Sequence, residues 1–163
     1  MPTSRTILAA PPRTATREPR TGRFSAPIAQ QVDVVRRLFE AFARRDVDAA
    51  LALLDRDVRF LPVTAHFAHE GHSYEGHAGI REYVRDVEEL WEQIDLIPLE
   101  YQAVVGVVVV IGEVRARASS NEFRAPVVWT WRLRDGLIVE GRVHSDLADA
   151  CAALGVREPR ASG

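Results

Sequence analysis

Apolar side chains recur at three- and four-residue spacing in two parts of the N-terminal half, which is the period of helices with one buried face. The first part predicts a helix over residues 29–45, with a stripe formed by Val32, Val35, Leu38, Phe39 and Phe42. Asp46 ends this helix and opens a short second one over 47–54. The second part predicts a helix over 78–93, with a stripe that includes Ile80, Tyr83, Val84, Val87 and Leu90. Three N-terminal helices are therefore expected.

The rest of the chain is rich in β-branched and aromatic residues, which are typical of strands. Strands are predicted over residues 57–62, 96–105, 107–118, 123–133 and 137–144. Asp135-Gly136 predicts a two-residue hairpin turn, because both residues accept a positive φ. Asp146 is placed to cap a last helix that carries Leu147 and Leu154. Short links between the last four strands indicate antiparallel pairing.

This order of elements predicts an α+β fold. A curved antiparallel sheet should carry the three N-terminal helices on one face, with a short C-terminal helix at the end of the chain. We expect residues 28–156 to form this domain, residues 1–27 to be a disordered leader, and residues 157–163 to be a flexible tail.

Composition and charge narrow the classes of partner. The net charge of −2 argues against nucleic acid, since phosphate binding needs a basic face. No apolar run reaches the ~18 residues of a membrane-spanning helix, so no membrane partner is expected. All 21 basic residues are Arg, which is typical of a high-GC, bacterial genome. The leader lacks the apolar core of a secretory signal, so we expect a cytoplasmic protein.

Three motifs in order resemble the SnoaL-like polyketide cyclase group of the nuclear transport factor 2-like superfamily. V-V-R-R-L-F-E-A-F-A-R-R-D-V-D-A-A-L is similar to the opening of that domain. The start of the third helix in that domain is similar to Y-E-G-H-A-G-I-R-E-Y-V. Its last hairpin and the helix that follows, which begins at an Asp, resemble L-R-D-G-L-I-V-E-G-R-V-H-S-D-L-A-D. The resemblance covers about residues 30–155. It implies a cone-shaped α+β barrel, open at one end and often a homodimer. Members are isomerases, cyclases, epoxide hydrolases or non-catalytic proteins, and we expect no cofactor.

The turns predict which side chains share a face. A two-residue turn at 135–136 sets Val128 opposite Val143, and a four-residue turn at 119–122 sets Glu113 opposite Val128. One face would then carry Glu113, Arg115, Thr130 and Val143, and the other Trp129, Trp131 and His144. A slip of one residue in either turn would exchange these sets.

The resemblance favours the face with Glu113 as the lining of the cone. In the family's cyclases and epoxide hydrolases, a catalytic carboxylate stands at the place of Val143, and a charged pair of the hydrolases falls at Glu113 and Arg115. Trp129 and Trp131 would then look outward and form a homodimer contact on the outer sheet face. The chain departs from the family pattern, because Val143 is no acid and Pro62 replaces the catalytic Asp of the ketosteroid isomerases.

Glu113 and Arg115 are the leading catalytic candidates, since a carboxylate in a partly apolar cavity can be tuned for acid–base work. The alternative is a structural ion pair. His66, His144 and Asp146 are lesser candidates: His66 lies in a loop with His69 and His72, whose spacing matches no compact zinc motif, so no metal is expected. Asp146 is read first as a helix cap.

The sequence thus predicts a domain that binds a small apolar or polycyclic molecule in its cone, with acid–base chemistry of the isomerase, cyclase or epoxide hydrolase type. The alternative is a non-catalytic ligand-binding or dimerisation module. The expected ligand-binding residues are Phe39, Phe42, Tyr83, Val87, Thr130 and Val143.

Overall fold

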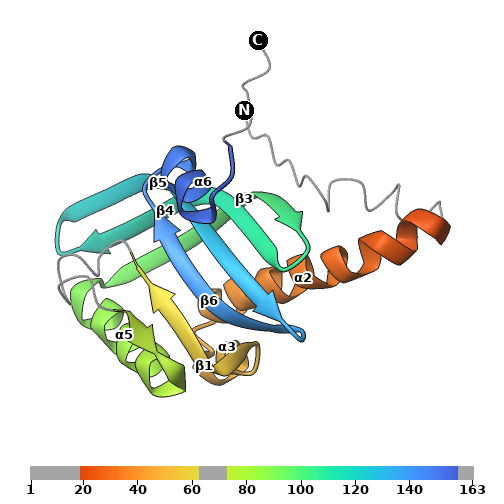
Figure 1. Ribbon diagram of the computed structural model, residues 1–163. Coiled ribbons are helices and arrows are strands. Elements are labelled where there is room, and N and C mark those ends of the chain that lie inside the picture. Colours follow the sequence, from red (N-terminus) through yellow and green to blue (C-terminus); the bar gives the residue numbers. More distant parts are fainter. Residues whose placement is uncertain (1–18, 63–72, 158–163) are drawn as a thin grey trace, which may run out of the picture.

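A single curved sheet organises the protein, with three helices on its inner face and one on its outer face (Figure 1). The computed structural model describes residues 19–62 and 73–157. Six strands lie in the order β2-β1-β6-β5-β4-β3. The fold is α+β, as the order of elements predicts. In the described ranges, no helix is both long and apolar enough to cross a membrane.

The inner helices are α2 (Pro19–Ala43), α3 (Val47–Leu51) and α5 (Gly76–Leu90). Helix α2 begins ten residues before the predicted start, at a proline, which the first turn of a helix accepts because its amide has no partner there. The expected disordered leader therefore overlaps this helix at 19–27, and residues 1–18 lie outside the described ranges. Asp46 opens α3 as predicted, and its side chain caps that helix by accepting a bond from the Ala49 amide.

The strands are β1 (Leu54–Leu61), β2 (Tyr74–Glu75), β3 (Gln93–Val104), β4 (Val107–Ala118), β5 (Asn121–Arg134) and β6 (Leu137–His144). The predicted bounds of β4 and β6 are confirmed. β1 pairs in parallel with β6, whereas all other neighbours are antiparallel. The short β2 has no predicted counterpart. Helix α6 (Leu147–Leu154) follows β6 and is capped by Asp146, as predicted.

A β-bulge in the β5–β6 pair overturns the predicted register of β6. The ladder pairs Leu133 with Ile138 but Arg132 with Glu140, so Val139 has no partner. An extra residue in one strand shifts every later pair by one. Val143 consequently lies opposite Trp129, and His144 lies opposite Val128.

The β4–β5 turn is also tighter than predicted, because Ala118 pairs with Asn121 across Ser119 and Ser120. This moves the partner of Glu113 from Val128 to Pro126. The shift is two residues, so it leaves the sharing of faces on these strands unchanged.

The inner face is the one with the tryptophans, which corrects the predicted orientation. Trp129 and Trp131 are only 2% and 4% exposed, and Phe39 of α2 packs edge-on against both. Glu113 belongs to the alternate set and therefore lies on the outer face. Burying two large aromatic side chains stabilises the fold by several kcal/mol, at about 25 cal/mol per Å². That gain decides which face the helices cover.

Candidate functional site

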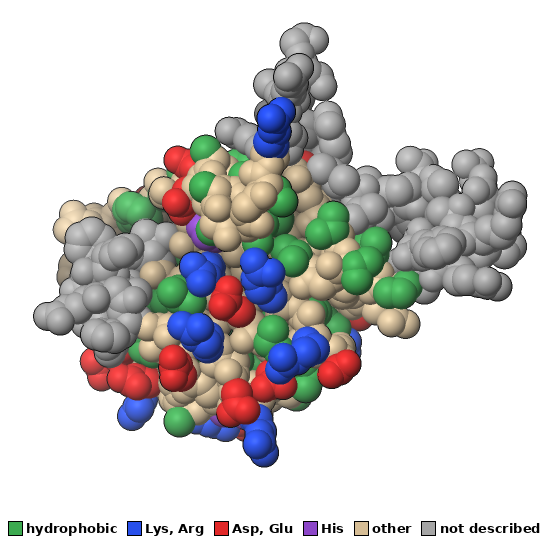
Figure 2. Space-filling view, in the orientation of Figure 1, with side chains coloured by type: hydrophobic (Ala, Val, Ile, Leu, Met, Phe, Trp, Pro, Cys, Tyr) green, Lys and Arg blue, Asp and Glu red, His purple; other side chains and the backbone are tan. Residues whose placement is uncertain are grey.

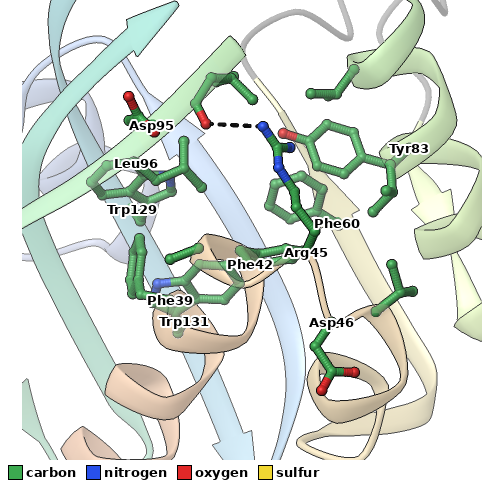
Figure 3. Close-up of a pocket in the computed structure, with 15 residues that line it drawn as sticks. Phe39, Phe42, Arg45, Asp46, Phe60, Tyr83, Asp95, Leu96, Trp129 and Trp131 are labelled. Atoms are coloured by element: carbon green, nitrogen blue, oxygen red, sulfur yellow. Dashed lines mark hydrogen bonds between the residues drawn. The ribbon is translucent and has the colours of Figure 1, made fainter. Parts of the chain in front are cut away.

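A cavity of about 100 Å³ lies between the inner face of the sheet and helices α2 and α5 (Figure 3). Its deep end is formed by four buried aromatic residues, Phe39, Phe60, Trp129 and Trp131. Its sides are apolar and come from Phe42, Tyr83, Val84, Val87, Ile94 and Leu96. Exposed residues Ala43, Arg45, Asp46 and Asp95 stand at its open end.

The aromatic rings hold one another in place. Phe39 meets Trp129 edge-on at 5.0 Å between ring centroids. Phe60 stacks on Trp131 at 6.0 Å and meets Tyr83 edge-on at 4.8 Å. Such pairs contribute about 0.5–1.5 kcal/mol each beyond their buried area. The deep wall is therefore a preformed aromatic surface.

Arg45 stands at the mouth because of the way α2 ends. The Arg45 amide donates to the Phe42 carbonyl at 3.0 Å, and the Asp46 amide donates to the Ala41 carbonyl at 2.9 Å, which is a Schellman ending. The residue at this corner has a φ of +58°, a conformation that costs a non-glycine residue about 1 kcal/mol. The Arg45 Nη2 donates to the Ile94 carbonyl of β3 at 3.3 Å. Its side chain thus spans the mouth from α2 to β3.

Tyr83 supplies a second donor at this end. Burial raises the pKa of its phenol to about 12, so the hydroxyl keeps its proton at neutral pH. In Figure 3 the Tyr83 hydroxyl and the Arg45 guanidinium point toward one another. The nearby carboxylates are engaged elsewhere: Asp46 caps α3, and Asp95 accepts a bond from Gln93 Nε2 at 2.9 Å. The mouth therefore offers hydrogen-bond donors to a guest.

The deep wall carries one further donor. Nε1 of Trp131 is buried and has no hydrogen-bond partner within the described part of the chain. A buried N–H without a partner costs about 1–3 kcal/mol. This atom is closed off from the cavity, so Arg45 and Tyr83 are the donors that a guest at the mouth can reach.

The expected position of Glu113 and Arg115 in this cavity is wrong. Both lie on the outer face of the sheet, where Arg115 Nε donates to Glu113 Oε1 at 2.8 Å and Arg124 Nη2 donates to Glu113 Oε2 at 3.0 Å. Partial desolvation tends to raise the pKa of Glu113, but the bonds from Arg124 and Arg115 outweigh it and hold the pKa below its ordinary value. This geometry is that of an ion-paired carboxylate. A catalytic role for the two residues stays a prediction.

The other expected residues divide between the two faces. Phe39, Phe42, Tyr83 and Val87 line the cavity. Val143 shares the inner face through its pairing with Trp129, but it does not line the cavity. His66 lies outside the described residues.

Thr130 belongs to the outer face, where it takes part in a buried chain of hydrogen bonds. Its Oγ1 lies 3.0 Å from His144 Nε2, and His144 Nδ1 lies 2.9 Å from Asp149 Oδ2. Asp149 is on α6, so the chain fastens this helix to the sheet. Asp146 accepts a bond from the Asp149 amide at 2.8 Å and acts as a cap. These side chains do not belong to the cavity.

Several lining residues were missed by the sequence reasoning, chiefly Arg45, Phe60, Trp129 and Trp131. Two tryptophans at i and i+2 of one strand are a signal that was available, because large aromatics prefer the interior to an open surface. Arg45 has no such signal, since its place depends on a left-handed helix ending that glycine or asparagine usually marks.

In the described ranges, no group of three or more His, Cys, Asp or Glu side chains is arranged to hold a metal ion. Acidic and basic side chains are interspersed on the face that Figure 2 shows. On β5 and β6, Glu140 pairs with Arg142 at 3.0 Å and with Arg132 at 3.7 Å. This part of the outer face is therefore charged, in contrast with the aromatic interior.

Comparison with known proteins identifies relatives of this architecture. A family model described as the SnoaL-like domain matches residues 35–141. No curated protein matches the chain.

Solved structures share the fold over most of their length. A nuclear transport factor 2-like protein of unknown function from Burkholderia pseudomallei K96243 is 28% identical, with a TM-score of 0.66 over 76% of this chain and 95% of that one. TerC, co-crystallised with polyporic acid, is 21% identical, with a TM-score of 0.67 over 77% and 98% of the two chains. A candidate polyketide cyclase from Xanthomonas campestris pv. campestris is 20% identical, with a TM-score of 0.64 over 77% and 97%.

Proposed function

Because the chain belongs to the SnoaL-like domain family, we propose that it binds a small aromatic molecule in the inner cavity. The observation that carries the proposal is the preformed aromatic wall at the deep end of the cavity, which is formed by Phe39, Phe60, Trp129 and Trp131. Exposed residues surround the open end of the cavity. An aromatic wall with a few polar groups at its rim is typical of small-molecule sites.

The size of the cavity narrows the class of ligand. At about 100 Å³ it is smaller than the ~300–1,000 Å³ of most drug-sized sites. Apolar cavities on the order of 150 Å³ hold benzene. We therefore propose a ligand with a single ring rather than a polycyclic one. TerC, which has the same fold, was crystallised with polyporic acid, and this supports an aromatic guest.

Binding, rather than carboxylate-based acid–base catalysis, is the activity that the lining supports. Glu113 is on the opposite face of the sheet, and the two carboxylates at the mouth are already hydrogen-bonded. The resemblance places the family's catalytic carboxylate at Val143, which cannot exchange a proton. The proposal therefore assigns no proton-transfer step to these groups.

The experiment follows Trp129 and Trp131 by fluorescence while toluene, benzamide and benzoate are titrated. We expect at least one probe to change the emission and to raise the melting temperature. Val87→Phe fills the cavity and should abolish both effects. Glu89→Phe is the matched control, because it adds the same ring to an exposed position of α5 and should bind as the wild type does. If none of the three probes binds, or if Val87→Phe binds as well as wild type, the proposal is wrong.

A further inference from the structure

We infer that the ligand of the cavity is an aromatic carboxylate and that Arg45 selects it at the mouth. This inference rests on the proposed function and names the chemistry of its ligand. It follows from the free donors of Arg45, the backbone conformation at that residue, and the Tyr83 hydroxyl beside them.

The guanidinium of Arg45 forms few hydrogen bonds for a charged group. Its only hydrogen bond within ranges 19–62 and 73–157 is the 3.3 Å contact with the Ile94 carbonyl. No carboxylate of those ranges forms an ion pair with it, although Asp46 and Asp95 also line the cavity. By contrast, Arg81 and Arg124 each hold a carboxylate at 2.7 Å and 3.0 Å. The remaining N–H groups of Arg45 can form the two-pronged contact with a carboxylate that arginine favours.

The backbone conformation at position 45 favours glycine, so the arginine found there is explained by its side chain and not by the fold. The φ of +58° is a conformation that glycine adopts without strain, and it closes α2 with the same two hydrogen bonds whichever residue stands there. Strained residues of this kind gather at functional sites. Arg45 therefore adopts a disfavoured left-handed backbone conformation and places a positive charge at the mouth of the cavity.

The Tyr83 hydroxyl adds a second donor beside Arg45. It stands at the same end of the cavity as the Arg45 guanidinium, and the two groups point toward one another in Figure 3. A carboxylate at the mouth would accept from Arg45 and Tyr83 while its ring packs on the aromatic wall. A ligand cation at the mouth would be repelled by the Arg45 guanidinium.

The test compares benzoate with benzamide, which has the same shape and no charge, and with toluene. Wild-type protein should bind benzoate about tenfold more tightly than benzamide, which is the worth of one charge-assisted contact. Arg45→Gly should lose this preference while its melting temperature stays equal or rises, because glycine relieves the left-handed corner. Arg44→Ala is the control: it removes the same charge from the neighbouring exposed position and should keep the preference.

The outcomes separate this inference from the proposed function. Equal binding of benzoate and benzamide by wild type would overturn the inference and leave the proposed function standing. An equal loss of preference in Arg44→Ala would show a general effect of charge and would overturn the role of Arg45. If no probe binds, the proposed function fails, and the inference fails with it.

Discussion

Gly141 lies directly opposite Trp131 in the β5–β6 ladder, and the bare glycine leaves the space that the indole occupies. A Cβ atom at 141 would stand 2.7 Å from Cε3 of Trp131 and 3.0 Å from Cδ2 of Phe60. Both rings belong to the deep wall of the cavity. A strand position without a side chain thus sets the shape of the inner surface.

We expect Gly141→Ala to destabilise the fold by about 1–3 kcal/mol, the usual cost of overpacking, because the methyl group drives Trp131 toward the cavity. Binding of the single-ring probes should weaken as well. Urea unfolding measures the first effect and fluorescence titration the second. Adding Trp131→Phe should return part of the lost stability, since the smaller ring makes room for the methyl group. A Gly141→Ala protein as stable as wild type would contradict the packing described here.

All three tyrosines should resist ionisation. Burial raises the pKa of Tyr83 to about 12, and it also raises the pKa values of Tyr74 and Tyr101. The hydrogen bond with Asp86 raises the pKa of Tyr74 further. At Tyr101 the positive charge of Arg36 opposes the increase. The unfolded chain releases these protons near pH 10, so the folded state holds more protons than the unfolded state above that pH. The free energy of unfolding should therefore be unaffected by these groups below about pH 10 and should fall as the pH rises toward about 12.

Urea titrations at several alkaline pH values measure this fall, and phenolate absorbance reports the ionisation. Tyr83→Phe should make the decline less steep, because it removes one of the three groups. Phenolate absorbance with a midpoint near pH 10, while the protein stays folded, would show that the phenols are exposed.

Glu113→Gln should leave binding in the cavity unchanged within about a factor of two, because Glu113 and the cavity are on opposite faces of the sheet and share no partner. The same titration with Tyr83→Phe should show a loss for benzoate, which makes it the positive control. If Glu113→Gln weakens binding as much as Tyr83→Phe does, the two faces are coupled, and the site must be redrawn to include the outer one.

A homodimer through the outer sheet face remains our proposal for assembly, although the tryptophans that first suggested it lie inside. The outer face holds an apolar groove of about 310 Å³ beside α6, lined in part by Val104, Val109 and Leu154. Light scattering at high micromolar concentration should give twice the 18.2 kDa mass of the chain.

Val109→Arg should dissociate this dimer by placing a charge in the groove. Val105→Arg is the matched control, since Val105 is 75% exposed at the β3–β4 turn and does not line the groove. A wild-type mass of 18.2 kDa would rule the assembly out.

Local signals in the sequence were sufficient for most elements and insufficient for the site. Asp135 and Gly136 have the positive φ values that a tight turn needs, and Asp46 and Asp146 cap their helices as their side chains predict. The choice of inner face failed for two physical reasons. Val139 is a β-branched residue like Ile138 before it, so nothing in its chemistry marks a bulge. The resemblance also favoured the face with Glu113 as the inner one, whereas burying the two tryptophans stabilises the fold more than burying a carboxylate does.

The place of Arg45 could not be predicted at all. Its position at the mouth depends on the last turn of α2 ending in a left-handed residue, and the sequence R-R-D contains no glycine to announce it. Such a site becomes visible only when the backbone angles are known.

The bulge at Val139 determines which side chains of β6 face the interior. If Val139 paired with Arg132 instead, the ladder would run without a bulge, Glu140, Arg142 and His144 would turn toward the helices, and Gly141 and Val143 would turn away from them. The polarity of the interior thus depends on the register of β6 as well as on the kinds of side chain that the strand carries. A shift of this register by one residue would exchange an apolar interior for a charged one without any change in the sequence.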